Sequence, residues 1–124
     1  MSKSGCRYGT HRVLNPAGTL PPPAVTLHNT MEIYDNEILI DVKTLNIDSA
    51  SYTQIRQACG ADADKMKDMI LSIVKERGKM QNPVTGSGGM LIGTVKEIGP
   101  KFPNTQRIKV GDKIATLVSL SLTP

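Results

Sequence analysis

Four small residues in a row, Gly86-Ser87-Gly88-Gly89, are the first place in this 124-residue chain where residue types and spacing suggest chemistry. Backbone amides of such a loop bind phosphate when the loop opens a helix and a Lys-Ser or Lys-Thr pair follows it. Here no such pair follows, and the next apolar residues are typical of a β-strand. The dinucleotide fingerprint is also missed, because Leu91 stands at the position of its third glycine. We therefore interpret this stretch as a tight turn or a close approach of two backbone segments.

The cysteines and histidines offer a weaker candidate, a metal site. Cys6 and Cys59 lie far apart, no Cys-x-x-Cys pair is present, and His11 and His28 are isolated. A zinc site built from these four residues would lack the regular ligand spacing of known zinc motifs. We interpret both cysteines as free thiols of a cytoplasmic protein.

The charge pattern argues against several classes of partner. The formal net charge of +4 comes from scattered lysines and arginines, and the aromatic residues are three Tyr and one Phe. Nucleic-acid-binding surfaces combine a basic patch with aromatic side chains that stack on bases, so we expect no nucleic-acid partner. The N-terminus is polar and no apolar run approaches the length of a membrane span, so we expect no membrane partner and a cytoplasmic location.

The elements around the glycine-rich stretch predict one mainly β domain with short helices, folded as a small and strongly bent β-barrel. Strands are expected over 37–47, 90–99 and 107–117, and helices over 49–60 and 62–77. Ile38, Ile40 and Val42 alternate along the first strand, so we expect them on one face of a central strand.

The second helix and the N-terminal segment have clear sequence signals. Acidic residues begin the helix over 62–77, basic residues end it, and Gly78 suits a left-handed C-cap. Its Met- and Ile-containing stripe is expected to pack on the barrel. Residues 1–23 are rich in turn formers and are expected to form an extended segment, with a short strand near 11–14 and with Pro21-Pro22-Pro23 in polyproline conformation.

A family resemblance enters with two glycine motifs. Gly93-x-Val95-x-x-Ile98-Gly99, followed by Val110-Gly111-Asp112-Lys113-Ile114, resembles the GroES-like catalytic domain of the medium-chain dehydrogenase/reductase superfamily, over roughly residues 24 to 119. The resemblance implies a GroES-like barrel, incomplete at its C-terminal end, in which residues 61–79 form an inserted helix. The stretches 5–13, 44–51 and 78–89 are similar, more closely, to diamino-acid dehydrogenases of lysine fermentation. This resemblance implies NAD(P)-dependent oxidative deamination of a 3,5-diamino acid to a 5-amino-3-oxo acid.

The positions that correspond to zinc ligands carry other residues. Zinc-dependent members of the superfamily have Gly-His-Glu where this chain has Gly88, Gly89 and Met90. Their cysteine ligand falls on Asp48 or Ser49, so no His-Cys pair remains. Because a glycine has no side chain that ligates a metal, we predict an enzyme without catalytic zinc.

Our hypothesis places the substrate pocket between segment 46–52 and the loop 85–89. Hydride transfer belongs to the nicotinamide, so the protein supplies orientation and electrostatics. We expect Asp48 to pair with a substrate ammonium, with Ser49 and Ser51 beside it as the other catalytic residues. The remaining substrate-binding candidates are Asn46, Tyr52, Thr85 and Ser87. Asp48 or Ser49 has an alternative role as the N-cap of the following helix.

A dinucleotide-binding domain is not visible in this sequence. No βαβ unit with a glycine fingerprint is present, so we expect NAD or NADP to be bound by a missing C-terminal Rossmann domain and this chain alone to be inactive. We expect the complete protein to form a homo-oligomer. The alternative hypothesis is a non-catalytic GroES-like module for interaction or assembly.

Overall fold

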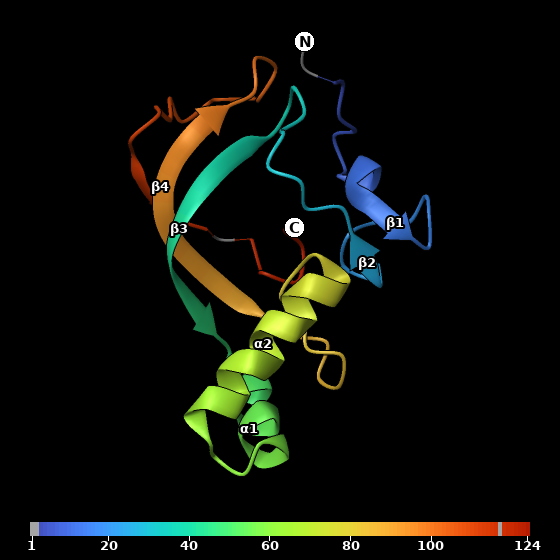
Figure 1. Ribbon diagram of the computed structural model, residues 1–124. Coiled ribbons are helices and arrows are strands. Elements are labelled where there is room, and N and C mark those ends of the chain that lie inside the picture. Colours follow the sequence, from blue (N-terminus) through green and yellow to red (C-terminus); the bar gives the residue numbers. More distant parts are fainter. Residues whose placement is uncertain (1–2, 117) are drawn as a thin grey trace.

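Two open antiparallel sheets, two α-helices and a short 3-10 helix make up the computed structural model, which describes residues 3–116 and 118–124 (Figure 1). The larger sheet has the order β3-β4-β5, with bounds Ile38–Ile47, Gly89–Ile98 and Lys113–Ala115. The smaller sheet pairs β1 (Val13–Asn15) with β2 (Thr26–Leu27). A mainly β fold with short helices is therefore confirmed, but the described strands do not close into a barrel. None of the described helices is both long and apolar enough to cross a membrane.

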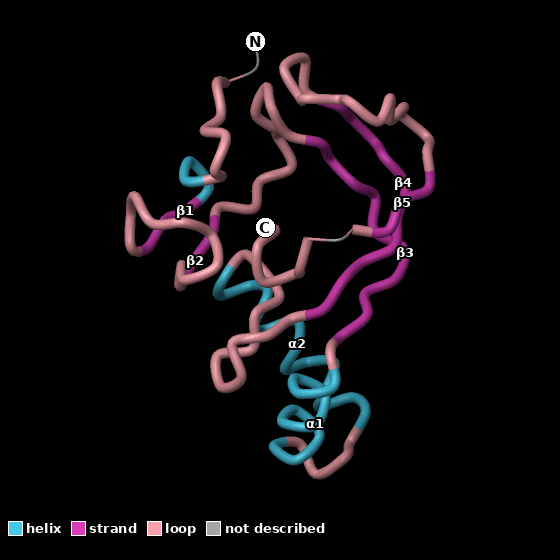
Figure 2. The backbone as a smooth tube through the Cα atoms, turned by 180° about the vertical axis from the view of Figure 1, so that it is seen from behind, coloured by secondary structure: helices cyan, strands magenta, loops and turns pink. Residues whose placement is uncertain are grey.

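The long strands β3 and β4 run side by side along their full length and curve together (Figure 2). β4 lies in the middle of the sheet and β3 at its edge, so the central position predicted for segment 37–47 is wrong. Ile40, Asp41 and Val42 pair with Val95, Thr94 and Gly93 without a register shift, as the predicted common face of Ile40 and Val42 requires. The register shifts between Leu39 and Ile40 and again between Val42 and Thr44. The two shifts lie on either side of this stretch. Ile40 packs on the core, while Val42, farther along the strand, is 45% exposed.

The third predicted strand is shorter than expected. Of segment 107–117, only Lys113–Ala115 pairs with β4, and Leu117 lies outside the described residues. Before β5 the chain turns tightly: Lys109 donates its backbone N–H to the Asp112 carboxylate, and Gly111 has a positive φ of 96°. The Ile and Val residues of this segment favour a strand. The strand is shorter because the turn that returns the chain to the sheet edge requires a positive φ at Gly111.

Both helices lie where the sequence predicts them. Helix α1 spans Ser49–Ala58 and α2 spans Ala63–Arg77. The Asp62 side chain caps α2 by accepting two backbone N–H bonds, and Gly78 ends the helix at a positive φ of 71°. A side chain at Gly78 would also collide with the carbonyl group of Leu27. This glycine is thus required both by its angle and by the close approach of β2.

The main hydrophobic core joins the helices to the sheet. Its buried members are Ile55, Ile73, Met80, Leu91 and Leu120, and the apolar stripe of α2 packs against them. The stripe therefore packs within the domain as expected, but against an open sheet and α1 rather than a closed barrel. A second, smaller cluster of Val13, Ala24 and Leu27 joins the two short strands.

The short strand expected near residues 11–14 is formed as β1, but the N-terminal segment is otherwise more folded than expected. It contains the 3-10 helix η1 (Thr10–Arg12), strand β1 and a turn at Pro21-Pro22-Pro23, closed by a hydrogen bond from the Ala24 N–H to the Pro21 carbonyl. The polyproline conformation predicted there is therefore not formed. Lys79 explains the difference: its side chain is buried (1% exposed) and its Nζ donates to the Pro21 carbonyl at 2.7 Å.

An ion pair between the buried Arg12 and the partly buried Glu37 attaches this segment to the start of β3. The Arg12 guanidinium bonds both carboxylate oxygens of Glu37 and donates to three backbone carbonyls, while the Nε2 atom of His11 lies 2.9 Å from Glu37. Burial opposes ionisation of Glu37, but the bonds from Arg12, the Tyr34 backbone and His11 outweigh it and lower the pKa of Glu37 to about 2.

Candidate functional site

The junction between β3 and α1 brings Asp48 to the glycine-rich loop. The Oδ1 atom of Asp48 accepts the Ser51 backbone N–H at 2.7 Å and the Ser87 hydroxyl at 3.1 Å. The Asp48 backbone N–H donates to the Gly88 carbonyl at 3.0 Å. Asp48 is therefore the N-cap of α1, as one of the two sequence-based alternatives proposed, and it also joins the helix to a loop far away in sequence.

Three hydroxyl groups surround this carboxylate. The Ser87 Oγ atom lies 2.9 Å from the Ser51 Oγ and 2.8 Å from the Thr85 Oγ1, and Ser51 also donates to the Ser87 carbonyl at 3.0 Å. Each hydroxyl has one proton to donate. Because Ser51 bonds the carbonyl and Ser87 bonds Asp48, Thr85 is left to donate to Ser87 or, at 3.3 Å, to the Ser51 Oγ atom. We call the four side chains of Asp48, Ser51, Thr85 and Ser87 the Asp48 cluster.

Hydrogen bonding sets the charge of the Asp48 cluster. Partial burial would raise the pKa of Asp48, but hydrogen bonds from the Ser51 backbone, the Ser87 hydroxyl and the Gly88 backbone lower it below its usual value. Asp48 is therefore a stable carboxylate at neutral pH. A carboxylate with a lowered pKa is a poor proton acceptor and a good partner for a cation.

The loop beside the cluster is shaped by close backbone contacts. A side chain at Gly88 would collide with the Met80 carbonyl, and one at Gly89 would collide with the Asn46 carbonyl. Gly89 also has a φ of 140°, a value that favours glycine. The predicted close approach of two backbone segments at this glycine-rich stretch is confirmed.

The remaining predicted site residues lie around the cluster rather than in it. Asn46 pairs with Met90 across the sheet and lines an open cavity of about 330 Å³ with Gly89 and Thr116. Ser49 is the exposed first residue of α1, and no side-chain hydrogen bond of Ser49 occurs within the described residues.

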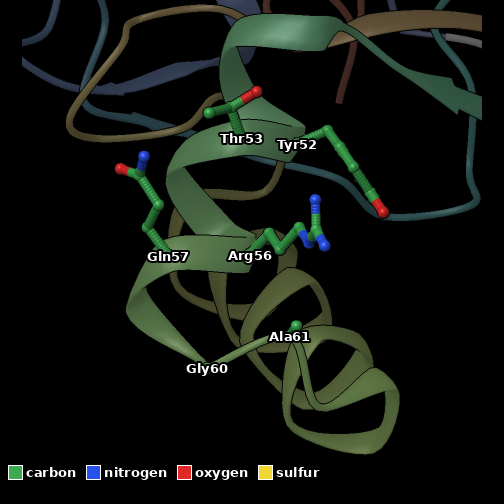
Figure 3. Close-up of a pocket in the computed structure, with 6 residues that line it drawn as sticks. All are labelled: Tyr52, Thr53, Arg56, Gln57, Gly60 and Ala61. Carbon is green, nitrogen blue, oxygen red and sulfur yellow. The ribbon is translucent and has the colours of Figure 1, made fainter.

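Tyr52 faces a different part of the surface. It lines two adjoining cavities of about 270 Å³ each, one along α1 and one between α1 and α2. Figure 3 shows Tyr52 and Arg56 extending from the same side of α1, away from Thr53 and Gln57. The structure thus brings together four of the seven predicted residues and places Asn46, Ser49 and Tyr52 at its margins.

Two polar residues of the site escaped the sequence analysis. Asn82 is fully buried (0% exposed), and its side-chain amide donates to the Gln54 Oε1 atom of α1 at 2.9 Å. The Asn82 Oδ1 atom accepts the backbone N–H groups of Val84 and Thr85. An Asn-Pro pair is a recognised turn signal, so the turn was detectable. The bond to Gln54 was not, because it depends on packing between distant segments.

The two segments that correspond to the zinc ligands of the superfamily are adjacent in space, because the Asp48 backbone N–H donates to the Gly88 carbonyl. Within residues 3–116 and 118–124, no three His, Cys, Asp or Glu side chains are grouped closely enough to hold a metal ion. The absence of catalytic zinc remains a prediction, which metal analysis of the purified protein would test.

Comparison with known proteins gives the family. A family model covers residues 11–124, nearly the whole chain, and describes the N-terminal domain of a dehydrogenase. The family is that of the L-erythro-3,5-diaminohexanoate dehydrogenase N-terminal domain, and the chain belongs to this family.

Two curated relatives carry the same name. The chain is 67% identical over 122 residues to L-erythro-3,5-diaminohexanoate dehydrogenase of Fusobacterium nucleatum and 64% identical over 120 residues to that of Acetoanaerobium sticklandii. These alignments cover 98% and 97% of this chain but 35% of each relative. The chain therefore spans about a third of the length of the relatives that it matches.

Proposed function

We propose that this chain is the substrate-binding domain of an NAD(P)-dependent oxidoreductase that converts L-erythro-3,5-diaminohexanoate to 5-amino-3-oxohexanoate. The printed names of the two relatives support the substrate. The glycine motifs that resemble GroES-like domains support the role of the domain. In the proposed reaction the carbon at position 3 loses a hydride, water supplies the new carbonyl oxygen, and ammonium is released.

The Asp48 cluster is the observation that carries this proposal. A diamino acid presents ammonium groups, and an ionised carboxylate beside hydroxyls is the matching partner. Oδ1 of Asp48 is occupied by Ser51 and Ser87, which fix the direction of the carboxylate. Asp48 holds a substrate ammonium, and the exposed Thr85 hydroxyl offers a further hydrogen bond.

The nicotinamide would accept the hydride, but no residue of this chain is assigned to it. The described residues contain no βαβ unit that would bind a dinucleotide. The role of this chain is therefore confined to binding and orienting the substrate, and we place the cofactor on a separate Rossmann domain. These are contributions of position and charge, which enzymes commonly supply to cofactor chemistry.

The test is Asp48→Asn in the full-length protein. Asparagine is as good an N-cap as aspartate, so α1 is preserved while the negative charge is removed. We expect KM for the diamino acid to rise at least about tenfold, because a charge-assisted hydrogen bond is lost. The matched control is Asp62→Asn, which makes the same exchange at the N-cap of α2 and should leave KM unchanged.

Two results would contradict the proposal in different ways. An unchanged KM in Asp48→Asn would remove the ammonium-binding role. A full-length protein with no turnover of the diamino acid, together with a stable and specific oligomer, would favour the non-catalytic assembly module instead.

A further inference from the structure

Asn82 makes several hydrogen bonds within the loop beside the Asp48 cluster. Its backbone N–H donates to the Ser87 carbonyl at 2.8 Å, and its own carbonyl accepts the Gly86 N–H at 2.7 Å. Its Oδ1 atom accepts the N–H groups of Val84 at 2.8 Å and Thr85 at 3.3 Å. Residue 82 is thus bonded to four of the next five residues of the loop.

The orientation of the Asn82 amide follows from its partners. Two backbone N–H groups converge on one side-chain atom, which must therefore be the oxygen. The other atom is then the nitrogen, and it lies 2.9 Å from the Oε1 atom of Gln54. Gln54 belongs to α1, the helix that begins at Asp48 and carries Ser51. The amide consequently ties the loop to the helix that supplies the other half of the cluster.

Packing contributes little to the conformation of this loop. Residues 83–86 are all exposed, and the side chain of Val84 is 69% exposed. A segment with few buried contacts opens easily unless hydrogen bonds hold it. Most of the hydrogen bonds that close it run to Asn82, which is itself fully buried. A further bond, from Gln81 to the Gly86 carbonyl, lies on the exposed side.

We propose that Asn82 is the positioning residue of the Asp48 cluster, with Gln54 fixing its amide. By holding the loop, it keeps the Thr85 and Ser87 hydroxyls within bonding distance of Ser51 and Asp48. Asn82 acts through these residues and needs no contact with the substrate. The inference rests on the proposed function for its effect on substrate binding, but its effect on the loop stands on the hydrogen bonds alone.

The test uses four variants of the full-length protein. Asn82→Ala removes every side-chain bond of the residue, and Gln54→Leu removes only the acceptor on α1. Gln54→Glu keeps an acceptor for the Asn82 amide. Asn104→Ala is the matched control, because Asn104 also closes an exposed turn, by two bonds to Ile108, at the opposite end of β4.

If the binding groups are displaced, KM should change more than the amount of folded protein. We expect KM for the diamino acid to rise about tenfold or more in Asn82→Ala and by a smaller factor in Gln54→Leu, because small displacements of binding groups weaken binding strongly. Gln54→Glu and Asn104→Ala should leave KM unchanged. A lower melting temperature in Asn82→Ala with an unchanged KM would overturn the proposal and leave only a structural role.

A second measurement does not depend on turnover. Amide hydrogen exchange at Val84 and Thr85 should become at least about tenfold faster in Asn82→Ala and stay unchanged in Asn104→Ala, since the acceptor for these amides is lost. Unchanged exchange would overturn the positioning role. If the unsubstituted protein does not oxidise the diamino acid but exchange still responds, the proposed function fails while the control of the loop by Asn82 holds.

Discussion

The Ser87 hydroxyl donates a 3.1 Å hydrogen bond to the Asp48 carboxylate, although the two residues are 39 positions apart. This bond joins the N-terminus of α1 to the loop before β4. It gives Asp48 two roles at once, because the same oxygen atom also caps the helix through the Ser51 N–H. Helix start and candidate binding site are therefore parts of one hydrogen-bonded structure.

Removing the Ser87 hydroxyl should raise the pKa of Asp48. The bond from Ser87 favours the ionised carboxylate, so Ser87→Ala should move the Asp48 pKa upward, toward its usual value. A lowered folded-state pKa stabilises the fold above the unfolded-state pKa, and this contribution is lost as pH falls. NMR titration of the Asp48 carboxyl carbon measures the shift. Ser49→Ala, at the exposed start of α1, is the control, and an unmoved Asp48 pKa in Ser87→Ala would contradict the prediction.

The ion pair of Arg12 and Glu37 should make stability depend on acid pH. Glu37 titrates at about 2 in the folded protein, against a usual value of 4.5. Its contribution, at most about 3 kcal/mol, is present above pH 4.5 and is lost as pH falls toward 2. The difference in the free energy of unfolding between the natural protein and Glu37→Gln should shrink through this window. Glu97→Gln, at an exposed position of β4, should show no comparable loss.

Lys79 should make stability depend on pH in the alkaline range. Burial and the nearby charge of Arg77 lower the pKa of Lys79 from 10.5 to about 8. Between these values the unfolded chain binds more protons than the folded one, so stability rises with pH. Relative to Lys79→Met, the natural protein should gain up to about 3 kcal/mol from pH 8 to 10.5.

Denaturant unfolding at several alkaline pH values measures this gain. Lys75→Met, at an exposed position of α2, provides the control for general alkaline effects. A constant difference between the natural protein and Lys79→Met across this range would show that the ammonium group is not desolvated.

Gly78 and Gly60 provide a test of close packing. Both have positive φ, 71° and 63°, but a side chain at Gly78 meets the Leu27 carbonyl whereas open space surrounds Gly60. Gly60→Ala should cost about 1 kcal/mol from the backbone angle alone. Gly78→Ala should cost clearly more, because β2 must also move. Equal losses in the free energy of unfolding would mean that the approach of β2 to α2 adapts easily.

Local signals in the sequence determined both helices, β4, and the C-cap of α2 at Gly78. These features depend on residues close together in the chain, so apolar periodicity and capping chemistry were sufficient to predict them. The sequence also determined the family resemblance and four members of the candidate site.

Only the tertiary structure decided the features that depend on distant segments. The register between β3 and β4 shifts twice, the turn at Pro21 follows the buried ammonium of Lys79, and Asn82 meets Gln54 across the loop. In each case the partner that bonds a polar group or sets the register of a strand lies far away in the sequence. Local propensity carries no information about such partners, because they are selected by the burial of polar groups during folding.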